Sequence, residues 1–464
     1  MRLFSRLFWL TFVVTSTGCV SSAAGYRDAK AMVASRIGVT VHPHAIDDED
    51  TSKVVRDLLR KPLTADTAAK IALLHNAEVQ AAFDRIGVAR GQLVAAVRLP
   101  TPVVEGTLRF RKKSTDIGLA ASINIIDLVF LPLREAAASS ELDAAALEAA
   151  GTVMDVAYEA RTAYYDCVAA EQSLELAKSV LGAEDAGAEL SKELGNAGNV
   201  PRLEVLVDRA MYEEARLALA EAAGLRRRSR ERLNAALGLW GDAGTGWTVP
   251  ARLEDPPEKD PQLDGAERIA IQRSLDLDIA KHRYAAAAQQ ANAARAQGLI
   301  PSLSLGVDAE RDPEGWGVGP RIGLGIPLFY QGQGAVDASH AEMRRQQDLS
   351  DAMAVQIRAE ARALVTGVTR ARESTTFYKR TLLPLRQEII DETQLHYNAM
   401  GMSAFQLLAA KRSAIESARG YVGALREYWA ARANLDLLLA GRLSRPLLHD
   451  FGLGVRTSSG PAGE

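Results

Sequence analysis

The chain has 464 residues, and its 55 lysine and arginine residues nearly balance 58 aspartate and glutamate residues, giving a formal net charge of −3. This balance argues against a nucleic-acid-binding protein, because such proteins concentrate basic residues on one face. Two cysteines exclude a disulfide scaffold and a four-cysteine zinc site. After the N-terminus no stretch has the roughly 18 consecutive apolar residues of a membrane-spanning helix, which excludes a polytopic helical membrane protein.

The N-terminus has the features of an export signal. Two arginines precede the apolar run 7–14, which is too short to remain as a membrane span, so we predict a signal peptide over residues 1–18. The sequence that ends at Cys19 resembles a bacterial lipobox, although Ser16 stands where leucine is usual. We therefore expect lipidation of Cys19, which makes residues 19–62 a lipidated N-terminal segment. The alternative is an ordinary signal followed by an incidental cysteine.

Internal repetition divides the rest of the chain. We assign a first repeat to residues 63–240 and a second to residues 263–441, each with a helix, two β segments, a long helix and a further helix. Two unrelated glycine landmarks recur at one constant spacing, which indicates a tandem duplication. The landmark pairs are Gly198 with Gly401 and Gly238 with Gly441.

The segments between and after the repeats differ in composition from the repeats. Residues 241–262 are rich in glycine, aspartate and proline and are predicted to be a linker. Residues 442–464 are expected to form a loose C-terminal tail. Pro384 should kink the longest helix or start a fresh turn. Helices are expected over residues 64–97, 134–197, 200–237, 264–297, 328–400 and 403–440.

The β segments alternate apolar residues with small or polar ones. In the second copy Leu303, Leu305 and Val307 alternate with serine and glycine, and the first copy shows the same period of two near 104–110 and 117–125. A soluble β-sandwich would also alternate. The segment length of about 9 to 11 residues and the small lining face favour strands that cross a bilayer. Charged stretches at 111–114 and 310–315 are expected to be the loops between paired strands.

Four strands cannot close on themselves. An open sheet in lipid leaves unpaired backbone groups that cost several kcal/mol each. A dimer would supply eight strands, whose interior is filled by side chains, whereas a trimer could leave a pore. We therefore predict a mainly α protein with long antiparallel α-helical hairpins plus four β-strands per protomer, forming a trimeric 12-stranded outer-membrane barrel continued by an α-helical periplasmic tunnel. A periplasmic coiled-coil scaffold lipoprotein without a conduit is the alternative of another class.

Four sequence motifs, strongest in the second copy, are together specific. With these motifs the chain resembles the TolC-like outer-membrane efflux protein family over residues 63–441, and in particular its lipoprotein branch and its heavy-metal-associated members. The first copy is more divergent, since the sequence 127–132 replaces the expected Pro-Leu-Phe and glycines. The motifs are Gly298–Leu305, the sequence from Gly323 to Phe329 followed by Gly332 and Gly334, His396–Gly401 leading to Phe405–Arg412, and Tyr428–Trp429 with Arg432, Ala433 and Leu435.

The resemblance implies a homotrimeric channel-tunnel that does no bond chemistry. Such a protein has no catalytic residue and no cofactor, sits in outer-membrane lipid, extends into the periplasm and binds no nucleic acid. Its partners would be a periplasmic adaptor (membrane fusion) protein and an inner-membrane pump of the resistance-nodulation-division type. The implied function is a passive exit duct of a tripartite efflux system, here for heavy-metal cations such as copper. A drug or toxin duct and a type I protein export duct are the alternatives.

Catalytic and metal-binding motifs do not offer a competing function. The sequence has no P-loop, no nucleotide-binding glycine fingerprint, no HExxH and no GxSxG. The seven histidines are scattered, and only His42 and His44 lie close together, which does not indicate a metal site. We therefore predict a protein that is not an enzyme and holds no metal.

The resemblance also implies that two helix-hairpin turns form a closed tip that meets the adaptor. At both turns we expect the glycine, Gly198 or Gly401, to take a positive φ, because reversing a helix needs such a residue. Glu204 and Asp208 are spaced i, i+4 and are candidates for a tip constriction. The alternative is a solvated face or a salt bridge with a neighbouring arginine, Arg202 or Arg209. The turn residues are Gly195, Asn196, Gly198 and Asn199 in the first copy and Met400, Gly401, Met402 and Ser403 in the second.

Overall fold

The computed structural model of the chain describes residues 21, 23–39, 41, 49–110, 115–260, 263–300, 302–312, 314–326, 328 and 331–443. Several sequence predictions lie outside these residues. They concern the signal peptide 1–18, Cys19, His42 with His44, the loop 111–114 and the tail from residue 444 onward.

The fold is mainly helical, with four antiparallel strands, as predicted. Within the described part, no helix combines the length and the apolar character that a membrane crossing needs. The helices are α2 (Tyr26–Ile37), α3 (Glu49–Leu59), α4 (Ala65–His75), α5 (Ala77–Ala96), α6 (Ile126–Val129), α7 (Leu131–Asn196), α8 (Arg202–Leu237), α9 (Ala266–Arg273), α10 (Leu275–Leu299), α11 (Gln333–Phe377), α12 (Leu383–Asn398) and α13 (Ala404–Ala440), with a short 3-10 helix, η3 (Gly241–Gly244), and a π-helical turn, η4 (Tyr378–Leu382). The strands are β1 (Val103–Phe110), β2 (Thr115–Asn124), β3 (Leu303–Asp312) and β4 (Gly315–Leu324).

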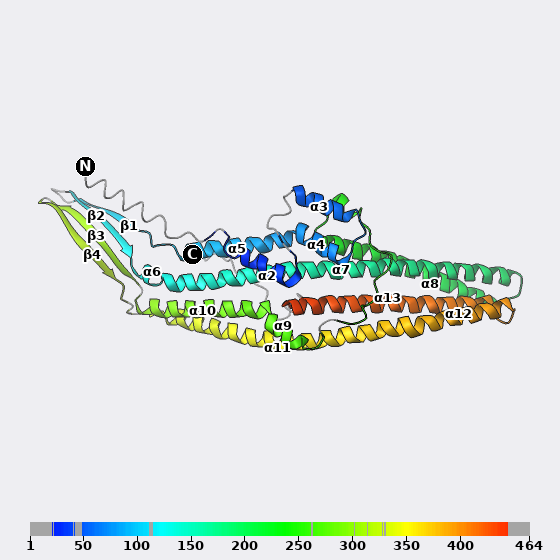
Figure 1. Cartoon of the computed structure of the whole chain (residues 1–464). Helices are drawn as coiled ribbons and strands as arrows, with labels where there is room; N and C mark the ends of the chain where they lie inside the picture. Colours follow the sequence, from blue (N-terminus) through cyan, green and yellow to red (C-terminus); the bar gives the residue numbers. More distant parts are fainter. Residues whose placement is uncertain are drawn as a thin grey trace. The chain divides into compact units, whose positions relative to one another are not determined.

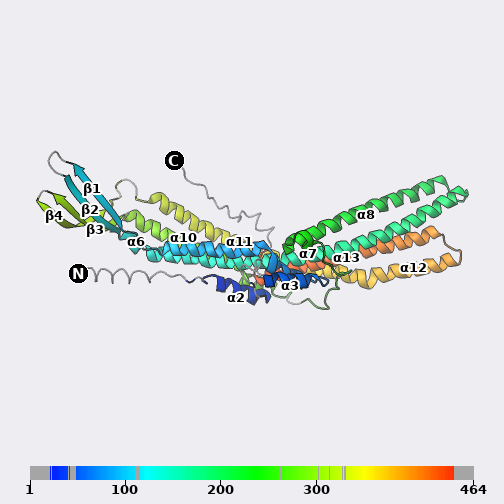
Figure 2. The same cartoon turned by 90° about the horizontal axis from the view of Figure 1, so that it is seen from above.

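The chain divides into two compact units, and each takes elements from both halves of the sequence. Unit 1 contains the four strands together with α10 and the first parts of α7 and α11, and its strands lie beyond the ends of these helices (Figure 1). Unit 2 contains α8, α12, α13 and the remaining parts of α7 and α11, arranged as two helical hairpins (Figure 2). Unit 1 comprises residues 1–32, 81–150 and 275–355, and unit 2 comprises residues 33–80, 151–274 and 356–464.

The same order of elements occurs twice along the chain. From α4 to α8 the chain forms two helices, two strands, a long helix and then a last helix. The same order recurs from α9 to α13. The duplication itself stays a prediction.

Two helices that the sequence predicts as continuous are each broken near the start. The predicted helix 64–97 is interrupted at Asn76, which has an extended backbone and accepts a hydrogen bond from the backbone of Glu78 at 2.8 Å. Ser274 breaks the predicted helix 264–297 in the same extended conformation. Asparagine and serine can cap a new helix with their side-chain oxygens, which compensates for the main-chain bonds lost at a break. The continuous-helix prediction was therefore wrong at these residues.

The longest predicted helix, 328–400, starts later than expected, at Gln333, and is interrupted before Pro384. Proline has no N–H for the next helical bond, and the helix absorbs this defect in the π-helical turn η4. The N–H of Leu383 donates to the carbonyl of Tyr378, five residues earlier. The interruption predicted at Pro384 is present, as a π-helical turn followed by the start of α12.

The four strands form one antiparallel sheet in the order β1-β2-β3-β4. The central pair, β2 with β3, joins the two halves of the sequence, with Ile123 opposite Leu305 and Ala121 opposite Val307. The predicted strands are therefore confirmed. The prediction of a loop over 310–315 was wrong at its start, because β3 continues to Asp312 and pairs there with Gly315 of β4.

The N-terminal segment contains two helices that the sequence analysis did not identify, α2 and α3. In α3 the acidic residues Glu49 and Asp50 occupy the first turn and Arg56 the last, a distribution that stabilises the helix dipole. That charge pattern was the available signal for this helix.

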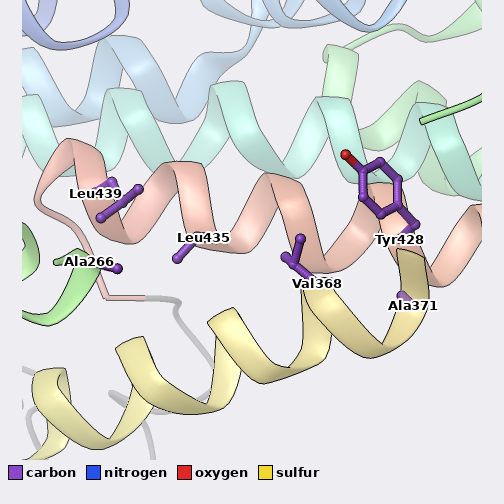
Figure 3. Close-up of a cluster of buried hydrophobic side chains, with 6 residues drawn as sticks. All are labelled: Ala266, Val368, Ala371, Tyr428, Leu435 and Leu439. Carbon is purple, nitrogen blue, oxygen red and sulfur yellow. The ribbon is translucent and has the colours of Figure 1, made fainter. Parts of the chain in front are cut away.

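Apolar packing in unit 2 brings α9, α11 and α13 together (Figure 3). Small side chains on α9 and α11 let these helices approach the large side chains of α13, and Tyr428 is completely buried there. The cluster consists of Ala266, Val368, Ala371, Tyr428, Leu435 and Leu439.

Gly238, which ends α8, should tolerate substitution much less well than nearby Gly241. Both have positive φ values, +72° and +60°. A Cβ at Gly238 would lie 2.8 Å from the carbonyl oxygen of His75, whereas one at Gly241 would meet nothing within 4 Å. We expect Gly238→Ala to lower the free energy of unfolding by about 3 kcal/mol, and Gly241→Ala by about 1 kcal/mol from backbone strain alone. Urea unfolding followed by tryptophan fluorescence measures both losses, and equal losses would contradict the steric explanation.

Candidate functional site

One face of the sheet is apolar across all four strands. The register places the apolar residues of neighbouring strands opposite one another, such as Leu108 with Ile117 and Leu305 with Ile322. These side chains are exposed in the single chain, to 81% for Phe110 and 73% for Val104. The face therefore lacks a covering layer within the described residues. It consists of Val104, Leu108, Phe110, Ile117, Leu119, Ala121, Ile123, Leu303, Leu305, Val307, Ala309, Trp316, Val318, Ile322 and Leu324.

The opposite face of the sheet is polar and concave. Arg321 on β4 forms a 3.1 Å ion pair with Glu105 on β1, although β2 and β3 lie between them. In a flat sheet three strand spacings would separate these strands by about 14 Å. Side chains that stand perpendicular to a flat sheet would not meet over that distance, so the ion pair indicates that the sheet curves toward this face. A second ion pair on the same face joins Arg109 of β1 to Glu310 of β3 at 3.3 Å, with β2 between them. Both pairs are exposed and stabilise the fold little.

Small residues allow the strands to approach closely on the polar face. A Cβ at Gly306 would lie 2.3 Å from the carbonyl oxygen of Ala121, and one at Gly323 would lie 2.5 Å from the hydroxyl of Ser304. Close approach therefore accounts for glycine at Gly306 of β3 and Gly323 of β4, whereas a Cβ at Gly317 or Gly319 would meet nothing nearer than 3.9 Å.

The turn between α7 and α8 reverses the first hairpin of unit 2. Gly198 has φ +76°, as predicted for this residue. Its N–H donates to the carbonyl of Gly195 at 3.0 Å, and the N–H of Asn199 donates to the carbonyl of Leu194 at 2.9 Å. This pair of bonds is a Schellman motif, which satisfies the last carbonyls of α7. Asn196 is the last residue of α7.

The turn between α12 and α13 has the same bonds around a different residue type. The N–H of Met400 donates to the carbonyl of Tyr397 at 3.0 Å, and that of Gly401 to His396 at 2.8 Å. Met400 takes φ +59°, so the prediction that Gly401 has the positive φ was wrong. Ala399 follows the last residue of α12, Asn398, with a negative φ of −81°, and the left-handed position falls on the next residue, Met400. Met400 is 95% exposed.

The second turn is closed by a capping box. The backbone N–H of Ser403 donates to the side chain of Gln406 at 2.9 Å, and the Ser403 hydroxyl accepts from the Gln406 N–H at 3.3 Å. Met402, which precedes the cap, is exposed. The first turn has no such cap, because α8 starts after Pro201.

Glu204 and Asp208 both lie in the first two turns of α8. Glu204 is exposed and Asp208 is half-buried, with one carboxylate oxygen, Oδ2, that is covered and has no hydrogen-bond partner. In the described part of the chain neither forms an ion pair with Arg202 or Arg209, so the salt-bridge alternative is not realised. Their role in a tip constriction stays a prediction.

A buried ion pair joins the two hairpins of unit 2. Glu184 on α7 accepts two hydrogen bonds from the guanidinium of Arg412 on α13. The carboxylate is almost fully buried, and paired geometry of this kind is among the stronger side-chain contacts. The pair fixes the hairpins against each other within unit 2.

The linker is not loose, contrary to what its composition suggests. We call residues 241–260 the strap, because its first part contacts α8 and its second part contacts α11 and α13. Trp247 is 1% exposed and donates from Nε1 to the side chain of Asn234 at 2.8 Å. The guanidinium of Arg230 lies 3.9 Å from the centre of the Trp247 ring. This contact was not predicted from the sequence. The available signal was Trp247, a single tryptophan between a glycine and a proline of the linker.

Two similar acid clamps hold the second part of the strap. Asp255 accepts hydrogen bonds from Lys379 at 2.6 Å and from the hydroxyl of Tyr421. Asp260 accepts from the guanidinium of Arg372 and the hydroxyl of Tyr428. The two cationic residues, Arg372 near the end of α11 and Lys379 in η4, are one heptad apart in the sequence. The two tyrosines, Tyr421 and Tyr428, are likewise one heptad apart on α13.

The clamps shift the pKa values of their carboxyl groups. Burial alone would raise the pKa of Asp260, but the hydrogen bonds from Arg372 and Tyr428 and the charge of Arg372 outweigh it and leave the pKa below its ordinary value. The hydrogen bond from Lys379, and then that from Tyr421, lowers the pKa of Asp255. Both clamps therefore hold ionised carboxylates.

No group of three or more acidic, histidine or cysteine side chains in the described residues could hold a metal ion. Cys167 is buried, and burial, the largest cause, raises the pKa of its thiol to about 12. The thiol is consequently protonated at neutral pH.

Comparison with known proteins adds to this description. Residues 70–239 match the family described as "Outer membrane efflux protein". The cobalt-zinc-cadmium resistance protein CzcC of Cupriavidus metallidurans is 23% identical over 393 residues, 82% of this chain and 90% of CzcC. The chain is thus similar to the outer membrane efflux protein family over residues 70–239. The family match and the similarities to CzcC and to outer-membrane channels together indicate an outer-membrane efflux protein and not an enzyme.

Two further similarities support this assignment at the level of sequence and fold. Protein CyaE of Bordetella pertussis is 27% identical over 313 residues, which are 61% of this chain and 64% of CyaE. The structure of the open state of the MtrE outer membrane channel of Neisseria gonorrhoeae superposes with a TM-score of 0.64 at 19% identity, covering 82% of this chain and 90% of MtrE. The efflux protein described here thus shares the fold of an outer-membrane channel.

The two hairpin turns should respond to substitution in opposite directions. Met400→Gly removes a left-handed side-chain conformation and should stabilise the α12–α13 turn by about 1 kcal/mol, whereas Gly198→Ala should destabilise the α7–α8 turn by about the same amount. Hydrogen exchange of the turn amides, of Gly401 in the first case and Asn199 in the second, measures both effects. Slower exchange in both variants or faster exchange in both would contradict the assignment.

The Asp260 clamp should make stability depend on pH. Its folded-state pKa is lowered, so its contribution is fully present above the unfolded value of about 3.9 and is lost as the pH falls through the folded value. We expect Asp260→Asn to lower the free energy of unfolding by about 2 kcal/mol at pH 7 and by much less near pH 3. Urea unfolding at both pH values measures this difference. Glu416→Gln on α13 is the control, and a loss for Asp260→Asn that does not change with pH would refute the charged clamp.

Proposed function

We propose that three copies of this efflux protein form a continuous exit duct across the outer membrane and into the periplasm. The observation that carries the proposal is the four-stranded sheet of unit 1, which has an uncovered apolar face, a concave polar face and two unpaired edges, β1 and β4. Lipid accepts such a sheet only when its edges are paired. Pairing of β4 with β1 of the next copy satisfies both edges and leaves a polar interior.

Three copies suit this closure better than two. A dimer would close eight strands, a size at which side chains fill the interior. Twelve strands from a trimer leave room for a passage, and the curvature already present in one chain is compatible with either number. The apolar residues of the sheet would face the acyl chains, and the ion-paired residues Glu105 and Arg321 would face the passage.

The hairpins of unit 2 would form the periplasmic part of the duct. We place the contact with a periplasmic adaptor protein at the two Schellman turns around Gly198 and Met400, and couple the adaptor to an inner-membrane pump of the resistance-nodulation-division type. The exposed Met400 supports this placement, because an unpartnered apolar side chain at a helix reversal is available for docking. Acylation of Cys19 after removal of residues 1–18 would anchor each copy to the membrane.

We propose heavy-metal cations as the cargo. The support is the similarity to CzcC, whose name describes cobalt, zinc and cadmium resistance, over most of the length of both chains. The duct itself performs no chemistry on the ions. It provides the path, and the pump would provide the energy.

Deletion of the gene and complementation test the cargo and the duct together. We expect the deletion strain to lose tolerance to cobalt, zinc, cadmium or copper and to regain it with the wild-type chain. Val318→Arg on the apolar face should fail to complement, since a cation facing lipid costs about 2–4 kcal/mol at the bilayer midplane. Arg321→Gln, on the polar face of the same strand, is the matched control and should complement.

The assembly has its own readout. Cross-linking of detergent-extracted protein should give trimers for the wild type and for Arg321→Gln, but not for Val318→Arg. A monomer that needs no detergent would overturn the duct. A trimer whose loss affects only organic toxicants, or only protein secretion, would retain the duct and overturn the metal cargo.

A further inference from the structure

A hollow in unit 2 is lined by four arginines from two helices. Arg228 and Arg232 of α8 and Arg419 and Arg426 of α13 surround it, and Asp166 of α7 is among its lining residues. We call this site the arginine hollow. Its volume is about 390 Å³.

The positive charge of the arginine hollow is only partly compensated. Asp166, whose side chain is 10% exposed, pairs with Arg232 at 3.3 Å and with Arg426 at 2.6 Å. Within the described residues Arg228 and Arg419 form no ion pair. Four guanidinium groups therefore face one carboxylate, which is already shared by two of them.

Several arginines close to the hollow are paired with carboxylates. Close by on α8, Arg226 and Arg230 share Glu171, and on α13 Arg412 is held by Glu184. The chain as a whole has a net charge of −3, so cations are not generally in surplus. The arginine hollow thus brings two arginines without an ion pair among the described residues, Arg228 and Arg419, next to two that share one carboxylate.

The floor of the hollow gives a ligand close access to these cations. Ala169 and Ser173 of α7 and Gly423 of α13 line it with small side chains. Guanidinium groups present several N–H donors in one plane and bind phosphate or carboxylate oxygens through paired hydrogen bonds. The space is large enough for a small anion such as a phosphate or diphosphate group.

We propose that the arginine hollow binds a phosphate or diphosphate group. Arg228 and Arg419 would supply the principal contacts, and Arg232 and Arg426 would add charge while they remain paired with Asp166. The inference goes beyond the proposed export of cations, because a site of this charge repels them. It depends only on unit 2 and not on the identity of the cargo.

Calorimetric titration of the detergent-purified full-length protein with pyrophosphate tests the proposal. We expect saturable binding that weakens as the salt concentration rises, because charged contacts are screened. The double variant Arg228→Gln with Arg419→Gln should bind at least tenfold more weakly. Arg227→Gln, an exposed neighbour outside the hollow, is the matched control and should bind like the wild type.

A variant with the opposite expected effect separates ligand binding from a general loss of structure. Asp166→Asn removes the carboxylate that competes for Arg232 and Arg426, so it should bind pyrophosphate several-fold more tightly. Two results with pyrophosphate would count against the site: no binding to the wild type at millimolar concentration, or equal affinities of the wild type and the double arginine variant. Either result would overturn the proposal if vesicles also show no arginine-dependent binding.

The source of the phosphate group is resolved with a second probe. Vesicles containing phosphatidylglycerol are compared with inorganic phosphate and pyrophosphate. Arginine-dependent binding of the free anions identifies a soluble ligand, and arginine-dependent binding of the vesicles alone identifies a lipid headgroup. Either result supports the site, whereas binding that does not change in the double variant overturns it.

Discussion

The unpaired edges of the four-stranded sheet constrain everything else in this protein. A strand edge exposes N–H and C=O groups that lipid cannot solvate, and the apolar face of the same sheet cannot be left in water without cost. The two requirements conflict in a single chain and are reconciled only when copies complete one another. The ion pairs across the polar face are then consequences of bending the sheet, and Gly306 and Gly323 let its strands approach closely on that face. The match of residues 70–239 to the outer membrane efflux protein family agrees with this physical argument.

The sequence was a good guide where one periodicity governs a segment. Alternation identified all four strands, because each strand has one apolar face, and helical composition located α7, α8 and α13 to within a few residues. It was a poor guide where a single side chain decides the backbone. The capping bonds of Asn76 and the left-handed conformation of Met400 depend on which residue happens to end a helix. The strap depends on partners more than 100 residues away, such as Lys379 for Asp255, which no local pattern reveals.

Unit 2 contrasts with the sheet in how it is stabilised. Its long helices bury apolar residues along much of α7 and α13, and specific polar contacts supplement this packing and the apolar cluster around Tyr428. The pair of Glu184 with Arg412 and the two clamps of the strap set the spacing of neighbouring helices. The arginine hollow lies in the same unit but differs from these contacts, because its cations outnumber its carboxylates. Such an imbalance is more consistent with a ligand than with structural pairing.

The pairing of β2 with β3 has a consequence for the origin of the chain. This pair joins the two sequence halves through main-chain hydrogen bonds. A half-length ancestor would have lacked this pairing, so two unassembled copies of it would have had two more exposed strand edges than the present chain has. Such an ancestor would have needed a ring of six subunits to present the same number of strands. Gene fusion would have turned three of the six junctions into contacts within one polypeptide, and the halves could then diverge separately. If the two repeats share such an origin, the left-handed position, held by Gly198 in one hairpin turn and by Met400 in the other, is a place where they have diverged.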